Sequence, residues 1–249
     1  MLYYRAMAIG KIYGIGVGPG DPELLTVRAV KLIAGVPVIC APLASIDSES
    51  FALSIVKGYI DPARQKVIAA LFPMSMDKAV LDKAWSDAAD AVTAELENGL
   101  DVAFLTLGDP SLYSTYSYIL AKIKARLPEV ISEIVPGVSS ISLAAARAGI
   151  ELGLGQERLV VMPVGRDMEA IRRAVTEYDT VVLMKVNRSF PKLVELLRDM
   201  GRLDNAVYVS RCGTDKERVI RDLASIKEDE LDYLSLVIIR KPSPPAPLP

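Results

Sequence analysis

The sequence has 249 residues, of which 51% are hydrophobic and 24% are charged, and its formal net charge is -2. Such a composition excludes a chain that is disordered throughout, because disorder requires low hydrophobicity and high net charge. The near-neutral charge, without a long basic run, gives no support for nucleic-acid binding, and the length allows one large domain or two small ones.

The first half of the chain alternates short apolar, β-rich runs with longer helical patterns. The run VAFLTL at 102–107 is apolar at nearly every position, which is typical of a strand covered on both faces. Asp21 is expected to cap a helix that begins at Pro22. This alternation favours a mainly parallel sheet. We predict strands at 11–16, 36–41, 66–72, 101–107 and 130–135, and helices at 22–34, 49–59, 77–97, 112–126 and 139–148.

The pattern restarts in the second half and closes with strand after strand, which indicates a mixed sheet. The sequence therefore predicts an α/β protein with an N-terminal domain at 1–136 and a C-terminal domain at 137–241. The Pro-rich segment 242–249 can continue neither a helix nor a central strand, so we expect a disordered tail. We predict strands at 158–164, 180–186, 206–210, 218–222 and 234–240, and helices at 168–176 and 191–200.

The chain contains no histidine. This excludes Ser-His-Asp and Cys-His catalysis, HExxH zinc sites and His-ligated iron. Proton transfer would have to use a carboxylate, Lys, Tyr, Cys or water. The two cysteines, Cys40 and Cys212, form no CxxC pair, so we expect no metal site and no disulfide framework. Their small number suits a reducing cytoplasm.

No apolar run approaches the roughly 20 residues that a membrane-spanning helix needs. The first residues show no apolar region followed by a cleavage site. We therefore expect neither membrane insertion nor export.

A glycine-rich loop, Gly14-Ile-Gly-Val-Gly-Pro-Gly20, follows the first predicted strand. It differs from a dinucleotide fingerprint, because Pro19 or Asp21 stands where the third glycine should be. It is not a P-loop either, since no GKS or GKT follows. Two interpretations stay open: a backbone that a ligand can approach closely, or a tight strand-to-helix turn.

Two further Gly/Pro loops, at 107–112 and 136–140, also lie between a predicted strand and a predicted helix. Ligands of open α/β sheets lie outside the carboxyl ends of the strands, so the three loops together predict one ligand site at one sheet edge. Asp109 could accept hydrogen bonds from a ligand or cap a helix, and Ser139 and Ser140 allow the same two interpretations.

Three motifs in this order and spacing resemble the tetrapyrrole methylase family: GVGPGDPELLT at 16–26, LGDPSLYST at 107–115 and PGVSS at 136–140. The resemblance extends over residues 10–240. It implies a S-adenosylmethionine-dependent methyltransferase with two α/β domains and a cleft between them. The segment LFPMSMD at 71–77 and Trp85 are most similar to the branch that methylates carbon 20 of precorrin-2 or cobalt-factor II in cobalamin biosynthesis.

The resemblance also implies the residues of the site. Met184 alone would otherwise be interpreted as a core methionine at the end of TVVLM. The cofactor-binding residues carried over from the family are Pro19, Leu107, Gly108, Asp109, Leu112, Ser139, Ser140, Met184 and Gly213.

The implied reaction transfers a methyl group to an electron-rich carbon, so the main task of the protein is to align the two reactants. Such alignment can lower the activation barrier by roughly 7–11 kcal/mol at best. Asp21 and Tyr113 are candidates for removing the proton afterwards, as is water. Ser114, Thr115 and Lys185 are candidates for binding the carboxylates of the tetrapyrrole substrate. Any cobalt would arrive inside the substrate.

Several alternatives stay open. A sister methylase acting at another ring carbon and diphthine synthase, which modifies a protein, share the fold. The uroporphyrinogen-III methylases carry an acidic residue after the second strand, where this chain has Pro42. A nucleotide-binding regulatory module is the alternative that is not an enzyme. The resemblance further implies a homodimer.

Overall fold

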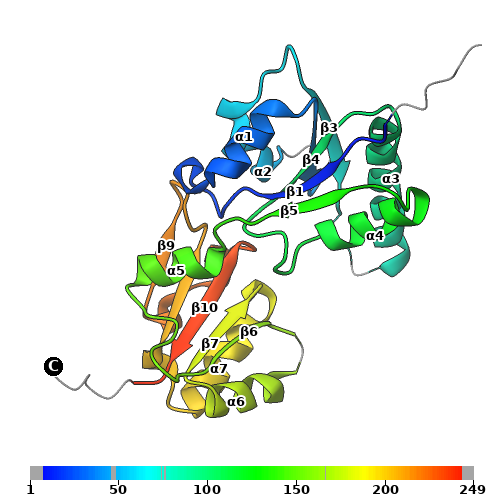
Figure 1. The fold of residues 1–249 in the computed structure, drawn as a ribbon. Helices are drawn as coiled ribbons and strands as arrows, with labels where there is room; N and C mark the ends of the chain where they lie inside the picture. The colour runs from blue at the N-terminus through cyan, green and yellow to red at the C-terminus, as the bar shows by residue number, and fades with distance from the viewer. Residues whose placement is uncertain (1–7, 46–48, 74, 76, 166, 243–249) are drawn as a thin grey trace, which may run out of the picture. The chain divides into compact units, whose positions relative to one another are not determined.

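Contacts divide the chain into two compact units, Met1–Ser139 and Ser140–Pro249. Each unit is built on one β-sheet (Figure 1). The expected Pro-rich tail falls almost entirely on 243–249, outside the described part of the chain. The computed structural model describes residues 8–45, 49–73, 75, 77–165 and 167–242.

The first unit contains a sheet with strand order β3-β2-β4-β1-β5, and every pairing within it is parallel among the described residues. The parallel sheet predicted from the alternating pattern is therefore confirmed. Its strands are β1 (Ile12–Gly16), β2 (Val38–Leu43), β3 (Lys66–Leu71), β4 (Val102–Thr106) and β5 (Ser132–Val135).

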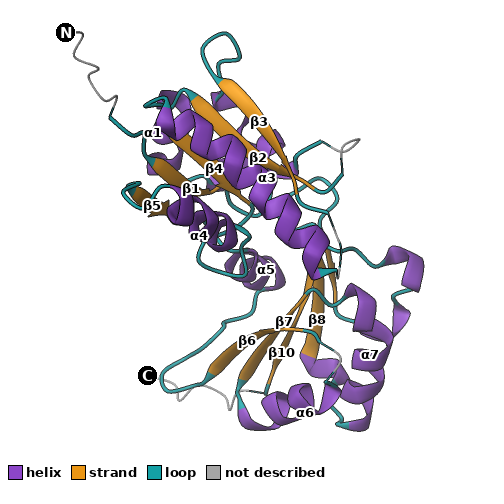
Figure 2. Ribbon diagram, turned by 90° about the vertical axis from the view of Figure 1, so that its right-hand side faces the viewer, coloured by secondary structure: helices purple, strands orange, loops and turns teal. Residues whose placement is uncertain are grey.

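Helices cover both faces of this sheet, as Figure 2 shows. Successive residues of a strand point to opposite faces. In β4, Val102 and Phe104 therefore pack with α3 (Lys78–Glu97) and α4 (Tyr116–Arg126), whereas Ala103 and Leu105 pack with α1 (Val27–Gly35) and α2 (Phe51–Val56). All five residues of β4 are buried, which explains its continuous apolar sequence.

The helix predicted at 22–34 is wrong at its start. Asp21 caps only a short 3-10 turn, Pro22–Leu24, by accepting a hydrogen bond from the Glu23 amide at 2.9 Å. The α-helix begins at Val27, because the Thr26 hydroxyl accepts a hydrogen bond from the Ala29 amide at 3.1 Å. Two capping residues in succession thus divide one predicted helix into two.

The helix predicted at 112–126 is also wrong at its start, since α4 begins at Tyr116. Tyr113 has φ = 51°, a left-handed conformation that interrupts a right-handed helix. The Ser114 hydroxyl then accepts a hydrogen bond from the Tyr116 amide at 3.0 Å. Leu112 consequently lies in the loop before the helix and not within its first turn.

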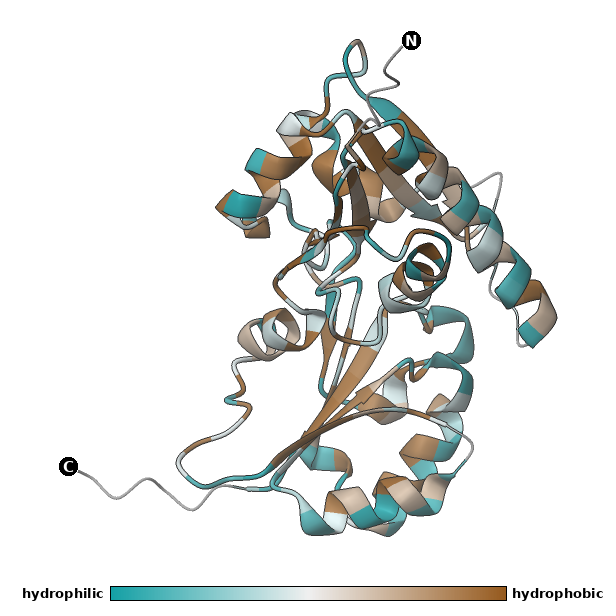
Figure 3. Cartoon of the chain, turned by 45° about the vertical axis from the view of Figure 1, so that its right-hand side comes forward, coloured by the Kyte–Doolittle hydropathy of each residue, from teal (hydrophilic) through white to brown (hydrophobic). Residues whose placement is uncertain are grey.

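The second unit contains a mixed sheet with strand order β6-β7-β10-β8-β9. Strands β6 and β7 are parallel, whereas the other pairings are antiparallel, so the predicted mixed sheet is confirmed. Figure 3 shows that its central strands are hydrophobic. Its strands are β6 (Leu159–Pro163), β7 (Thr180–Met184), β8 (Ala206–Ser210), β9 (Arg218–Ile220) and β10 (Ser235–Arg240).

The core of the second unit joins α6 (Met168–Glu177) and α7 (Phe190–Asp199) to strands β7, β8 and β10. Helix α5 (Ser140–Ala148) contacts β8. In the described part of the chain, no helix combines the length and the apolar character needed to cross a membrane.

Candidate functional site

The loops after β1, β4 and β5 lie at one edge of the first sheet, because its paired strands are parallel and their carboxyl ends share that edge. Gly18 and Gly108 exchange two backbone hydrogen bonds, of 2.8 and 3.3 Å. The Asp109 side chain accepts a hydrogen bond from the Gly137 amide at 2.9 Å. The three loops that the sequence predicts at one edge are therefore in direct contact.

Glycines are required where these loops meet. A Cβ atom on Gly16 would lie 2.6 Å from the Gly108 carbonyl oxygen and 2.6 Å from the Gly137 nitrogen. A Cβ atom on Gly137 would lie 2.3 Å from the same carbonyl oxygen. Gly18 and Gly108 have φ of 75° and 71°, which glycine adopts at no steric cost. The glycines thus let the three loops pack directly against one another, main chain on main chain.

Asp109 connects two of the loops. One carboxylate oxygen accepts from the amide of Ser111 at 2.8 Å and from its hydroxyl, and the other accepts from the Gly137 amide. Partial burial raises the pKa of Asp109, but these hydrogen bonds outweigh burial and hold the pKa below its ordinary value of 3.8. The carboxylate is therefore ionised at neutral pH and fixes the loop after β4 to the loop after β5.

The polar residues after Asp109 differ in what they contact. The Ser114 hydroxyl bonds the Tyr116 amide and lies 3.4 Å from the buried Thr106 hydroxyl. Thr115 occupies the N-cap position of α4, yet its side chain makes no capping hydrogen bond. Tyr113 is 46% exposed. No local pattern indicated that Thr106, the last residue of β4, would contact Ser114.

The remaining predicted residues of the first unit also lie at this edge, and Ser140, the first residue of the second unit, directly follows them in the chain. Pro19 is buried in the loop after β1, and Leu107 directly follows the end of β4. Ser139 is the last residue of the first unit, and Ser140 begins α5. The first amides of a helix have no partner within the helix, so this position offers hydrogen-bond donors.

The predicted residues of the second unit lie at one edge of its own sheet. Met184 ends β7, Lys185 follows it, and Gly213 comes shortly after the end of β8. The Gly213 amide donates to Glu217 at 2.7 Å, and Glu217 forms an ion pair with Arg147 at 3.2 Å. This loop is thus held by its own charged pair.

Neither cysteine supplies a thiolate. Burial raises the pKa of the Cys40 thiol to about 12. Burial and then the Glu217 carboxylate raise the pKa of Cys212 to about 12 as well. Both thiols are therefore protonated at neutral pH, when they would be poor nucleophiles. Among the residues that the structure describes, no three His, Cys, Asp or Glu side chains are grouped to hold a metal ion.

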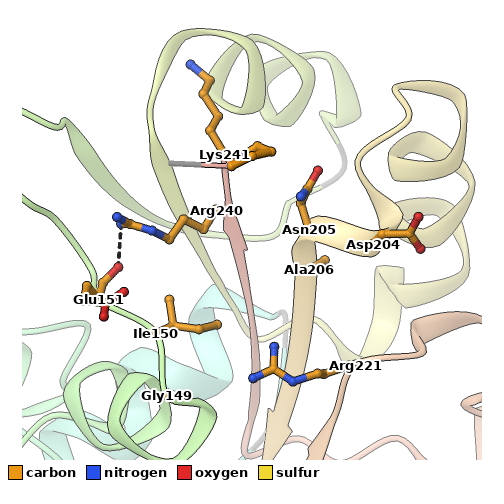
Figure 4. A pocket seen from close by; sticks show the side chains of 10 residues that line it. Gly149, Ile150, Glu151, Asp204, Asn205, Ala206, Arg221, Arg240 and Lys241 are labelled. Carbon is orange, nitrogen blue, oxygen red and sulfur yellow. Dashed lines mark hydrogen bonds between the residues drawn. The ribbon is translucent and has the colours of Figure 1, made fainter. Parts of the chain in front are cut away.

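A hollow of about 280 Å³ lies elsewhere in the second unit (Figure 4). It adjoins Ala206, the first residue of β8, and Arg240, the last of β10, so it is at the opposite strand ends from Met184. Arg240 donates to the Glu151 carbonyl at 2.6 Å and pairs with Glu157 at 2.9 Å. The arginine is thus already neutralised and positioned within the unit, and the hollow contains none of the predicted site residues.

The profile of the tetrapyrrole (corrin/porphyrin) methylases matches residues 11–226, and the chain belongs to this family. The family predicted from the three loop motifs is thereby confirmed.

Two similar curated proteins span almost the full length. The chain is 37% identical over 233 residues to a cobalt-precorrin-2 C(20)-methyltransferase of Salmonella typhimurium, covering 93% of this chain and 97% of that protein. It is 39% identical over 236 residues to a probable cobalt-precorrin-2 C(20)-methyltransferase of Methanocaldococcus jannaschii, covering 94% and 97%.

Two solved structures show the same fold. A cobalt precorrin-4 methyltransferase aligns with a TM-score of 0.70 and 22% identity, covering 92% of this chain and 94% of that one. A uroporphyrin-III C-methyl transferase from Thermus thermophilus, complexed with S-adenyl homocysteine, aligns with a TM-score of 0.64 and 21% identity, covering 93% and 92%.

We predict that Gly137→Ala destabilises the first unit by about 1–3 kcal/mol, because the new Cβ would overlap main-chain atoms that cannot rotate away. Urea denaturation measures the change. Gly35→Ala is the matched control: Gly35 ends α1 with nothing within 4 Å of the added atom, so it should be neutral or stabilising. Equal stability of the two variants would contradict the close approach of the loops.

We predict that Asp109→Asn lowers the free energy of unfolding by about 1–3 kcal/mol at pH 7. The main-chain amides of Ser111 and Gly137 would lose a charged acceptor, and the asparagine NH₂ group would face one of these N–H donors. In the wild type this stabilisation is fully present above pH 3.8 and is lost as the pH falls through the lowered pKa of Asp109. Thermal melting against pH should show a shallower acid limb in the variant. The control Asp61→Asn changes an exposed turn carboxylate of the same unit, and an equal loss there would refute the prediction.

Proposed function

We propose that the chain is a S-adenosylmethionine-dependent C-methyltransferase that methylates carbon 20 of precorrin-2 or cobalt-factor II in cobalamin biosynthesis. The observation that carries the proposal is the 37–39% identity, over nearly the full length, to two proteins named as cobalt-precorrin-2 C(20)-methyltransferases. A precorrin-2 C(20)-methyltransferase of a Sinorhizobium species is 33% identical, so the comparison favours the cobalt-containing substrate.

The loop edge of the first unit suits S-adenosylmethionine as a ligand. The cofactor has an amino-acid tail, a ribose and an adenine, all of which main-chain groups can bind. The contacts among Gly16, Gly108 and Gly137 hold the three loops together, so the main-chain groups of these loops keep fixed positions. The first amides of α5, which directly follows Ser139 in the chain, are further donors. We propose that Pro19, the loop at 107–112 and Ser139 hold the cofactor from this unit. Ser140, Met184 and Gly213 of the second unit are proposed as cofactor-binding residues on the family resemblance alone.

When bound, S-adenosylmethionine supplies a methyl group on a sulfonium, which is an excellent leaving group. The protein's task is then to position the acceptor carbon, and this fits a chain without histidine. Asp109 serves by fixing the loops, since both of its oxygens are already bonded to the protein. Asp21 and Tyr113 are the proposed candidates for removing the proton, although the Asp21 carboxylate also caps the turn that follows it.

We further propose a homodimer in the cytoplasm. The dimer follows from the family resemblance. The cytoplasmic location is supported by two free and buried cysteines, as is usual where thiols stay reduced.

A mass-spectrometric assay without oxygen tests the proposed function. S-adenosylmethionine is offered with metal-free and with cobalt-loaded precorrin-2 in parallel, and samples with added S-adenosylhomocysteine serve as controls. We expect one added methyl group, transferred faster to the cobalt form. No methyl group on either substrate, with S-adenosylhomocysteine still bound, would reject the proposal and favour a later ring methylation or a protein substrate.

We predict that Thr115→Ala raises the KM for the tetrapyrrole about tenfold, because a hydrogen bond to a carboxylate is worth roughly 1.5–3 kcal/mol and the Thr115 hydroxyl caps no helix. Ser114→Ala should raise this KM similarly, and it should also lower the melting temperature because the Tyr116 amide loses its acceptor. Steady-state kinetics measure both effects. Ser117→Ala, at an exposed position of α4, is the control; unchanged KM values in the first two variants would remove them from the substrate site.

A further inference from the structure

Three residues other than glycine have a left-handed backbone in the described part of the chain: Tyr113, Lys185 and Arg211, with φ of 51°, 59° and 50°. Such conformations are unfavourable for residues with a Cβ atom, and they are concentrated at functional sites. Two of the three are cations of the second unit. Lys185 directly follows β7 and Arg211 directly follows β8.

Lys185 and Arg211 lie at the same edge of the second sheet. Strands β7 and β8 each pair antiparallel with β10, so both end where β10 begins. The Lys185 amide donates to the Ser235 carbonyl at 3.3 Å, and the Arg211 amide donates to the Leu234 carbonyl at 2.9 Å. The two cations are therefore anchored to consecutive carbonyl groups at the start of one strand.

The guanidinium of Arg211 is oriented by a fixed carboxylate. Its Nε donates to Asp232 at 2.6 Å. Asp232 is fixed in turn, because its amide donates to the hydroxyl of the buried Tyr208 at 3.1 Å and its other oxygen accepts from the Leu234 amide at 2.8 Å. The Arg211 side chain is still 40% exposed. An arginine presents five donors in a rigid fork, so this contact leaves its terminal nitrogens suited to an incoming carboxylate.

Only one of the two cations, Arg211, has a carboxylate partner among the described residues. Lys185 is exposed, and it forms no ion pair with any residue that the structure describes. Asp232 offsets one of the two cations, and the nearby Glu217 is already paired with Arg147. Glycine or asparagine would adopt the left-handed conformation of Lys185 at lower cost. Because Lys185 forms no stabilising ion pair, its charge is more readily explained by binding of an anion.

We propose that Arg211 and Lys185 form an anion-binding pair that receives a peripheral carboxylate of the tetrapyrrole, with Asp232 as the positioning residue for Arg211. This inference rests on the proposed function. Arg211 receives the carboxylate through its terminal nitrogens, and Lys185 adds a second charge. The α-carboxylate of the cofactor has the same chemistry, so the test must distinguish the two sources.

Three variants test the pair. Arg211→Gln should raise the KM for the tetrapyrrole at least tenfold with little change in kcat, and Arg211→Lys should recover part of the loss, because it retains the charge without the fork. Lys185→Gly should raise the same KM and leave the melting temperature unchanged or higher, because the glycine relieves the left-handed backbone. A structural role for Lys185 predicts the opposite change in stability.

Three measurements are made on each variant. Calorimetry with S-adenosylhomocysteine should give a Kd within twofold of the wild type, and a weakened Kd would assign the pair to the cofactor and overturn the proposal. A fluorescence titration with an octacarboxylate porphyrin measures anion binding, and it does so even if the wild type transfers no methyl group. Arg211→Gln and Lys185→Gly should bind this porphyrin more weakly than the wild type. Added salt should reduce the difference in porphyrin affinity between Arg211→Gln and the wild type, because salt screens the attraction between charges.

Arg198→Gln is the matched control, since Arg198 is an exposed arginine on α7 away from the sheet edge. Arg198→Gln should change neither the KM for the tetrapyrrole nor the Kd for the porphyrin. Unchanged porphyrin binding and unchanged KM in both Arg211→Gln and Lys185→Gly would overturn the proposal. The proposal would also be overturned if Arg198→Gln lowered the affinity for the porphyrin as much as Arg211→Gln does.

Discussion

The close approach of three main-chain segments, at Gly16, Gly108 and Gly137, is the constraint on which the first unit's site depends. A single added carbon at Gly16 or Gly137 would come within 2.6 Å of the Gly108 carbonyl oxygen. The Asp109 carboxylate then bonds the Gly137 amide, so the loops after β4 and β5 are connected by charge as well as by packing. Neighbouring parallel strands bring the loops to one edge, and the glycines let them touch.

In the second unit, too, segments distant in the sequence meet at one edge of a sheet, but the sheet is mixed and not parallel. Because β10 runs antiparallel between β7 and β8, those two strands end at the same edge although a helix separates them in the sequence. The carbonyl groups of Leu234 and Ser235 then hold the main chain of Arg211 and Lys185. Positive charge is thereby presented from rigid strand ends, which suits the recognition of a polycarboxylate.

The chemical groups of the candidate site suit positioning of the reactants. The chain has no histidine, and both of its thiols have a pKa of about 12. The Asp109 carboxylate is already bonded to the protein through both oxygens. Hydrogen bonding and alignment are thus what the chain contributes, in agreement with a methyl transfer in which the reactants carry the reactivity.

The sequence by itself determined the alternation of strands and helices, the parallel and mixed sheets, and the family, because apolar runs and glycine loops are local signals. Tertiary structure decided the rest. The helix predicted from Leu112 begins at Tyr116, because Tyr113 is left-handed and the Ser114 hydroxyl accepts a hydrogen bond from the Tyr116 amide. Arg211 follows an ordinary apolar strand, and only the pairing with β10 and the contact with Asp232 give it a direction. Such contacts join residues distant in the chain, so no local pattern records them.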